Sequence, residues 1–95
     1  MHIVALKSPD SRDRRSVIHP DTVEKISTLQ GITFSFESGI GNGINISDKT
    51  FINMGLKALT RDECLSKGNL IITPTSLSLD ETVKVQSGST VLGMV

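Results

Sequence analysis

Short apolar runs alternate along the chain with segments of helical periodicity. Residues 2–6 form an apolar run that ends at a Lys-Ser-Pro-Asp turn, which is typical of a buried strand. Over residues 32–37 apolar and polar positions alternate, which predicts a second strand with one buried face. Further short strands are predicted over residues 56–59, 70–72 and 90–94.

Helix signals lie between these runs. A helix is predicted over residues 20–30, because proline suits its first turn and the glycine that follows suits a left-handed C-terminal cap. A second, short helix follows a cap at Ser47 or Asp48 and is closed by a glycine. Capping boxes at residues 60–63 and 78–81 begin two more helices.

The regular alternation of strands with helices predicts an α/β fold. Strands joined by helical connections pair in parallel, with right-handed crossovers and helices on both faces of the sheet. We therefore expect a three-layer α/β/α domain with a mainly parallel sheet of about five strands, flavodoxin-like or Rossmann-like. The length leaves room for one domain, residues 1–95, with no interdomain linker.

Composition and charge narrow the classes of function. Ten Lys and Arg balance ten Asp and Glu, whereas a nucleic-acid module normally carries a basic excess, so no nucleic-acid partner is expected. The single cysteine, Cys64, cannot form an internal disulfide, which favours a reducing compartment such as the cytoplasm. The apolar run over residues 2–6 is too short to span a bilayer, so no direct membrane insertion is expected.

Gly39, Gly41 and Gly43 are the first candidate for a binding loop. A dinucleotide fingerprint reads Gly-x-Gly-x-x-Gly between a strand and a helix, and Ile44 stands here where the third glycine belongs. We therefore interpret this stretch as a backbone turn in preference to a phosphate cradle.

A basic loop after the first strand is the second candidate. It carries Arg12, Arg14 and Arg15, and ligands of open α/β sheets bind at the carboxyl ends of the strands. An arginine there can bind a carboxylate through two parallel hydrogen bonds; the alternative is a solvated loop paired with neighbouring aspartates. His2 and His19 lack the spacing of a catalytic triad, and no catalytic, cofactor-binding or metal-ligating residue is predicted.

Several segments together resemble a known family. Residues 15–23 and the Glu-Ser-Gly-Ile-Gly run at 37–41, followed by Ser-Asp at 47–48, resemble the N-terminal domain shared by alanine dehydrogenase and the alpha subunit of proton-translocating NAD(P) transhydrogenase. In that family these segments read Arg-Val-Ala-x-Thr-Pro, Glu-x-Gly-Ala-Gly and Phe-Ser-Asp. The strand at 70–72 and the Gly-Ser-Thr turn at 88–90 fall at matching places, so the resemblance covers essentially the whole chain.

The resemblance implies a substrate-binding role for Arg15, which falls on the arginine that holds the substrate carboxylate in alanine dehydrogenases. Those enzymes also have a lysine shortly after the fourth strand, where this chain has Thr73-Pro74-Thr75. The transhydrogenase alpha subunit is therefore the closer match. An alanine dehydrogenase-like domain and a non-catalytic α/β interaction fragment or remnant are the alternatives.

The family binds NAD(H) mainly in a following Rossmann domain, which these residues do not contain. The resemblance implies that the chain is a truncated, N-terminal part of an oxidoreductase that transfers hydride between NAD(H) and NADP(H), coupled to proton translocation. Alone, it is expected to be inactive and to bind NADH weakly or not at all.

The resemblance also implies partners and a location. The expected partners are the NAD-binding domain and the membrane subunit of such an enzyme, at the cytoplasmic side of the inner membrane. Further copies of the chain are a third expected partner, because an uncovered apolar strand at residues 90–94 favours self-association as a homodimer or larger oligomer.

Overall fold

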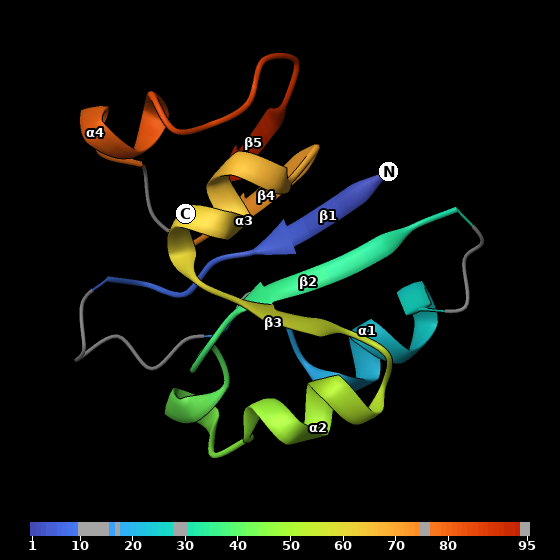
Figure 1. Cartoon of the computed structure of the whole chain (residues 1–95). Helices are drawn as coiled ribbons and strands as arrows, with labels where there is room; N and C mark the ends of the chain where they lie inside the picture. The colour runs from blue at the N-terminus through green and yellow to red at the C-terminus, as the bar shows by residue number, and fades with distance from the viewer. Residues whose placement is uncertain (10–15, 17, 28–30, 75–76, 94–95) are drawn as a thin grey trace.

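Five parallel strands form one sheet in the order β3-β2-β1-β4-β5 (Figure 1). The computed structural model of the chain describes residues 1–9, 16, 18–27, 31–74 and 77–93. The strands are β1 (His2–Ala5), β2 (Thr33–Glu37), β3 (Lys57–Leu59), β4 (Leu70–Thr73) and β5 (Thr90–Gly93). The helices are α1 (Pro20–Ser27), α2 (Asp48–Asn53), α3 (Arg61–Lys67) and α4 (Leu79–Thr82), with a 3-10 turn at Asn42–Ile44. The predicted α/β fold with a parallel, Rossmann-like sheet is confirmed.

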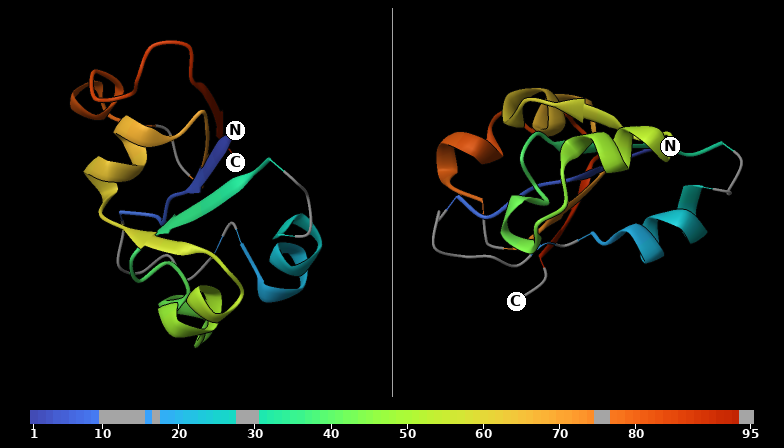
Figure 2. Two further views of the ribbon diagram at one scale, coloured as in Figure 1. Left: turned by 45° about the vertical axis from the view of Figure 1, so that its right-hand side comes forward. Right: turned by 90° about the horizontal axis from the view of Figure 1, so that it is seen from below.

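The helices cover both faces of the sheet. Helices α1 and α2 lie on one face and α3 on the other, while α4 lies at the periphery beyond α3 (Figure 2). The connections from β1 to β2 and β3 use the first face, and those to β4 and β5 use the second, as a constant crossover hand requires. No helix within the described ranges is long and apolar enough to cross a membrane.

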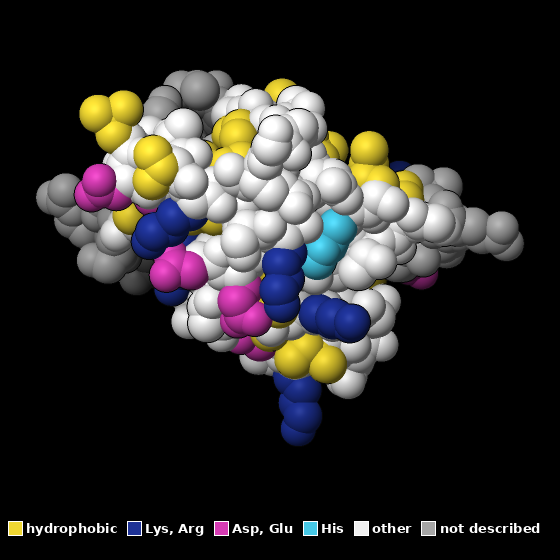
Figure 3. Space-filling view, turned by 45° about the horizontal axis from the view of Figure 1, so that its top comes forward, with side chains coloured by type: hydrophobic (Ala, Val, Ile, Leu, Met, Phe, Trp, Pro, Cys, Tyr) yellow, Lys and Arg dark blue, Asp and Glu magenta, His cyan; other side chains and the backbone are white. Residues whose placement is uncertain are grey.

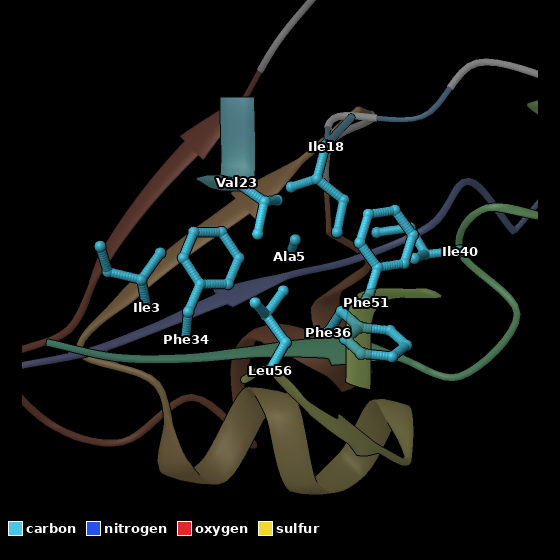
Figure 4. Close-up of a cluster of buried hydrophobic side chains, with 9 residues drawn as sticks. All are labelled: Ile3, Ala5, Ile18, Val23, Phe34, Phe36, Ile40, Phe51 and Leu56. Carbon is cyan, nitrogen blue, oxygen red and sulfur yellow. The ribbon is translucent and has the colours of Figure 1, made fainter. Parts of the chain in front are cut away.

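The larger core lies between the sheet and helices α1 and α2 (Figure 4). Successive side chains of a strand point to opposite faces, so Ile3 and Ala5 of β1 lie on this side with Phe34 and Phe36 of β2. The ring of Phe36 is tilted by 54° against that of Phe51 in α2, with the ring centroids 5.4 Å apart. This aromatic pair fixes α2 on the sheet.

A smaller core lies on the opposite face, between the sheet and α3. Val4 and Leu6 pack there with Ile71 of β4 and with Cys64 and Leu65 of α3. Burial raises the pKa of the Cys64 thiol to about 12, so this side chain is protonated at neutral pH and packs as a small apolar group.

The alternation over residues 32–37 predicts one buried face, and β2 buries more than that. Phe34 and Phe36 are buried as predicted; of the polar positions, Ser35 and Glu37 are buried as well, and Thr33 is exposed. The reason is that β2 lies inside the sheet and α3 covers its second face, as is usual for parallel strands.

Both predicted capping boxes are present. The Thr60 hydroxyl accepts a hydrogen bond from the backbone N–H of Glu63 at 3.2 Å, and Ser78 accepts one from Glu81 at 3.2 Å. In each case the glutamate returns the bond to the N-cap N–H. Local sequence therefore determines where α3 and α4 begin.

Helix α4 differs from α3 in how little it buries. It has four residues, and none of them is buried. Leu79 is 87% exposed and Val83, directly after the helix, is 83% exposed. The helix is held on the molecule by polar contacts and by Leu77 and Val85 on either side of it, which pack against the smaller core.

Candidate functional site

The strand order reverses between β1 and β4. The chain proceeds from β1 through β2 to β3 in one direction and then returns to β4 and β5 on the other side of β1. In open parallel sheets, ligands bind in the crevice at the carboxyl ends of the strands where such a reversal occurs. This carboxyl edge is therefore the candidate functional site.

Buried polar side chains gather at the same edge. Ser8 follows β1, Glu37 ends β2 and Thr73 ends β4, and all three are buried. Burying a polar group costs free energy unless it is hydrogen-bonded, so such groups are placed where the fold or its function requires them. Ser35, the other buried polar side chain of the described residues, lies further back in β2.

Arg61 links three parts of the carboxyl edge. It is the first residue of α3, and its Nη1 donates to Oε1 of Glu37 at 2.8 Å and to the carbonyl oxygen of Lys7 at 3.0 Å. Its Nε donates to Glu81 of α4. Glu37 also accepts the backbone N–H of Lys7 at 3.0 Å. One guanidinium therefore joins the chain after β1, the end of β2 and the peripheral α4.

These charges are shielded from solvent. The side chain of Arg61 is 20% exposed, that of Glu37 9% and that of Glu81 21%. The hydrogen bond from Arg61 holds the pKa of Glu81 below its usual range. Burial opposes the charge of Arg61, but the hydrogen bond to Glu81 and the charge of Glu37 prevail and raise its pKa. The Arg61–Glu81 pair is therefore ionised at neutral pH.

The arrangement suits positioning better than direct binding of an anion. Nη1 and Nε of Arg61 already serve protein acceptors, and its Nη2 is buried with no hydrogen-bond partner among the described residues. An anionic ligand at Nη2 would also meet the charges of Glu37 and Glu81. In the same ranges no three His, Cys, Asp or Glu side chains are grouped to hold a metal ion.

Two exposed ion pairs involve residues close in sequence to Arg61 and Glu81. Lys84 Nζ lies 2.9 Å from Oδ1 of Asp62, and Lys67 Nζ lies 3.4 Å from Oε2 of Glu63. Figure 3 shows basic and acidic side chains next to one another on this surface. The Lys84–Asp62 pair joins α3 to the chain directly after α4, in addition to the Arg61–Glu81 contact between the two helices.

The glycine loop is a closed turn. A Cβ at Gly41 would lie 2.5 Å from the carbonyl oxygen of Ile46, so this position has room only for glycine. Carbonyl oxygens of the loop accept hydrogen bonds from the N–H groups of Ile40, Asn42, Ile44, Asn45 and Ile46. A phosphate cradle needs N–H groups that point at the ligand, so the geometry agrees with a backbone turn.

Asp48, the first residue of α2, ties this loop to the end of β2. Its Oδ1 accepts the backbone N–H of Gly39 at 2.9 Å, and its Oδ2 accepts the Ser38 hydroxyl at 2.7 Å. The Glu-Ser-Gly-Ile-Gly run and the Ser-Asp pair, which carry part of the family resemblance, are therefore in direct contact.

Two solved structures resemble the fold of this chain. A transhydrogenase from Sinorhizobium meliloti matches 97% of the chain with a TM-score of 0.83 at 22% sequence identity. An L-alanine dehydrogenase matches 96% of the chain with a TM-score of 0.76 at 17% identity. The chain shares the fold of the segment that it matches in each of these two proteins.

The resemblance to the N-terminal domain of the alanine dehydrogenase and transhydrogenase family is thereby confirmed for the fold, and of the two structures the transhydrogenase superposes more closely. The chain spans 28% of the length of that transhydrogenase and 25% of that dehydrogenase. No protein-family model and no curated protein matches the sequence.

The predicted substrate-binding residue, Arg15, lies outside the described residues, as do Arg12 and Arg14. Its role stays a prediction. The residues that lead into its loop, Lys7 and Ser8, lie at the carboxyl edge next to Glu37.

The hydrogen bonds of the two histidines do not involve the Arg61 cluster. Nε2 of His2 is 2.7 Å from the Ser35 hydroxyl, at the start of β1, which is the opposite end of the sheet from the candidate site. His19 precedes α1, and its Nδ1 accepts the backbone N–H of Asp21 at 3.3 Å.

The Arg61 cluster is not among the sites that the sequence predicts. Glu81 forms the predicted capping box with one carboxylate oxygen, while its other oxygen accepts a hydrogen bond from Arg61. Glu37 occupies a polar position of the alternation over residues 32–37, where only the apolar positions are predicted to be buried. The available signal was a glutamate at the end of an interior strand, where a buried carboxylate needs a cation as its partner.

Proposed function

We propose that the chain is the N-terminal part of an NAD(P)-linked oxidoreductase of the transhydrogenase alpha-subunit type. The supporting observation is the match of 97% of the chain to a transhydrogenase with a TM-score of 0.83. In the complete enzyme, hydride passes between NAD(H) and NADP(H), coupled to proton translocation. The carboxyl edge at β1 and β4 forms one wall of the cleft, since that is where the reversal of strand order places a ligand.

In this proposal the residues of the edge have separate roles. Arg61, with Glu37 and Glu81, is a positioning residue that holds the chain after β1 against β2 and α4. Arg15, on the loop after β1, holds an anionic group of the ligand. The NAD-binding domain binds the nucleotide and carries out the hydride transfer. The membrane subunit is a further partner. Because the chain assembles with that subunit, it works at the cytoplasmic side of the inner membrane.

An alanine dehydrogenase-like activity has less support. Alanine dehydrogenases have a lysine shortly after the fourth strand, where it contacts the substrate. In this chain Thr73 and Pro74 occupy that part of the carboxyl edge. Both residues are buried, and neither side chain carries a charge.

Titration of the 95-residue chain tests the proposal. Calorimetry with NADH should give no micromolar affinity, because the nucleotide-binding domain is not within these residues. Amide spectra should show no change with pyruvate or alanine near Lys7 and Thr73. Micromolar NADH binding would contradict the proposed role as a cleft wall, and saturable pyruvate-induced shifts at the carboxyl edge would favour an alanine dehydrogenase-like activity.

A further inference from the structure

Two nitrogen donors from separate segments meet over Gly39 at the carboxyl edge. A Cβ built on Gly39 would lie 3.3 Å from Nζ of Lys7 and 3.3 Å from Nδ2 of Asn42. Lys7 lies two residues after β1, Gly39 lies two residues after β2, and Asn42 begins the 3-10 turn. Gly39 has a φ of +88°, so its backbone conformation favours glycine as well. The missing side chain leaves open the space between the ammonium and the amide.

The backbone of Lys7 is held on both sides by the Arg61–Glu37 pair. Its N–H donates to Oε1 of Glu37 at 3.0 Å, and its carbonyl oxygen accepts Nη1 of Arg61 at 3.0 Å. These two side chains are largely buried and are bonded to each other at 2.8 Å. The buried pair therefore fixes the point from which the Lys7 side chain extends, before any ligand binds.

The backbone of Asn42 is fixed by the glycine loop. Its N–H donates to the carbonyl oxygen of Gly39 at 3.1 Å, and its own carbonyl oxygen accepts the N–H of Asn45 at 3.2 Å. Asp48 accepts the N–H of Gly39. The backbone groups of this turn are thus used within the protein, and the side chains carry the donors that remain.

The ends of the two side chains have no acceptor within the described ranges. No oxygen there accepts a hydrogen bond from Nζ of Lys7 or Nδ2 of Asn42. Lys7 is half-buried and Asn42 is exposed, so a dissolved ligand can reach both. Glu37 and Asp48, the carboxylates bonded to these segments, already accept hydrogen bonds from other donors. An external anion is therefore a suitable acceptor for the two free donors.

We propose that Lys7 and Asn42 bind a phosphoryl group at the carboxyl edge, which is where open parallel sheets bind ligands. A lysine acts as a point charge that suits phosphate, whereas a planar carboxylate pairs best with the fork of an arginine. A phosphoryl group carries nearly two negative charges at neutral pH and directs its oxygens in several directions, so different oxygens can accept Nζ and Nδ2. The inference concerns this chain alone and is independent of the proposed function.

Titration of the 95-residue chain with inorganic phosphate tests the proposal. In amide spectra at about pH 7.5 and constant ionic strength, Gly39 and Asn42 should show saturable shifts with a Kd of about 1–10 mM. Acetate should produce none of these shifts, because it has a single charge and two coplanar oxygens. Glycerol phosphate should reproduce them and glycerol should not. Tighter binding of glycerol phosphate than of phosphate would assign the site to a phosphate ester, and equal binding to free phosphate.

Three variants locate the binding site. Lys7→Gln removes the charge and keeps the backbone bonds of this residue, and it should weaken phosphate binding at least about tenfold. Asn42→Ala, at an exposed position, should weaken binding about threefold, as expected for the loss of one hydrogen bond. Lys57→Gln is the matched control, because it removes the same charge from an exposed lysine at the start of β3, and it should bind like the parent chain.

Several outcomes would overturn the proposal. One is the absence of saturable shifts up to about 50 mM phosphate. Another is a response to acetate equal to the response to phosphate. Unchanged binding by Lys7→Gln, with circular dichroism like that of the parent chain, would also overturn it. So would equal weakening in Lys7→Gln and Lys57→Gln, because phosphate would then respond to net charge and not to the two donors over Gly39.

Discussion

Arg61 is the residue on which the carboxyl edge depends most, because its removal leaves Glu37 buried without a cation. We expect Arg61→Ala to lower the free energy of unfolding by about 3 kcal/mol, which is typical when one partner of a buried pair is removed. Lys84→Ala is the control, since it removes the exposed pair with Asp62, and should cost less than about 1 kcal/mol. Urea unfolding measures both, and equal losses in the two variants would contradict the assigned role of Arg61.

His2 makes the free energy of unfolding depend on pH. Burial, together with the charges of Lys57 and Lys67, holds the pKa of His2 below its usual value of 6.5. The unfolded chain therefore binds the proton more readily, so the contribution of His2 is complete above pH 6.5 and decreases as pH falls below it. His2→Gln should flatten the change in urea midpoint between about pH 7.5 and 5.5. An unchanged pH profile in this variant would show that other groups cause the effect.

At the scale of elements, α3 and α4 begin with the same capping box but have different roles. Helix α3 buries Cys64 and Leu65, while α4 buries no residue. We therefore expect Thr60→Ala to lower global stability by about 1 kcal/mol. Ser78→Ala should change it by less than about 0.5 kcal/mol and instead speed amide exchange in α4. The reverse order of effects would mean that α4 belongs to the cooperative core.

The elements differ in how far the sequence could predict them. The box that begins α3 depends on residues three positions apart, so local sequence specifies it. The burial of Glu37 depends on Arg61, which is 24 positions away, and on α3 covering β2. The Arg61–Glu81 contact spans 20 positions for the same reason. Strand order and long-range ion pairs can be recognised only in the folded structure, because they join residues far apart in the sequence. Caps, turns and strand alternation can be recognised in the sequence itself.

At the scale of the whole molecule, Cys64 reports on global unfolding. It lies fully buried in the smaller core with Val4 and Ile71. With a pKa of about 12 it should react with a disulfide reagent at least about 10³-fold more slowly than in the unfolded chain. The rate should rise with urea in parallel with circular dichroism. Fast labelling in the absence of urea would contradict the packing of this core.

The proposed role is also a property of the whole molecule. It requires that the chain can replace the matching segment of a transhydrogenase, although only 22% of the residues are identical. The carboxyl edge, whose parts Arg61 links, would then face the nucleotide of the host protein.

The most direct test is a graft of this chain into the Sinorhizobium meliloti transhydrogenase in place of its matching segment. The rate of hydride transfer between NADH and an NADP analogue is measured, with NADH affinity as the control for a folded host. We predict that the graft binds NADH like the host and transfers hydride within about tenfold of the host rate, a difference of about 1.4 kcal/mol in the barrier. A graft that binds NADH with the host's affinity and transfers no hydride would contradict the account.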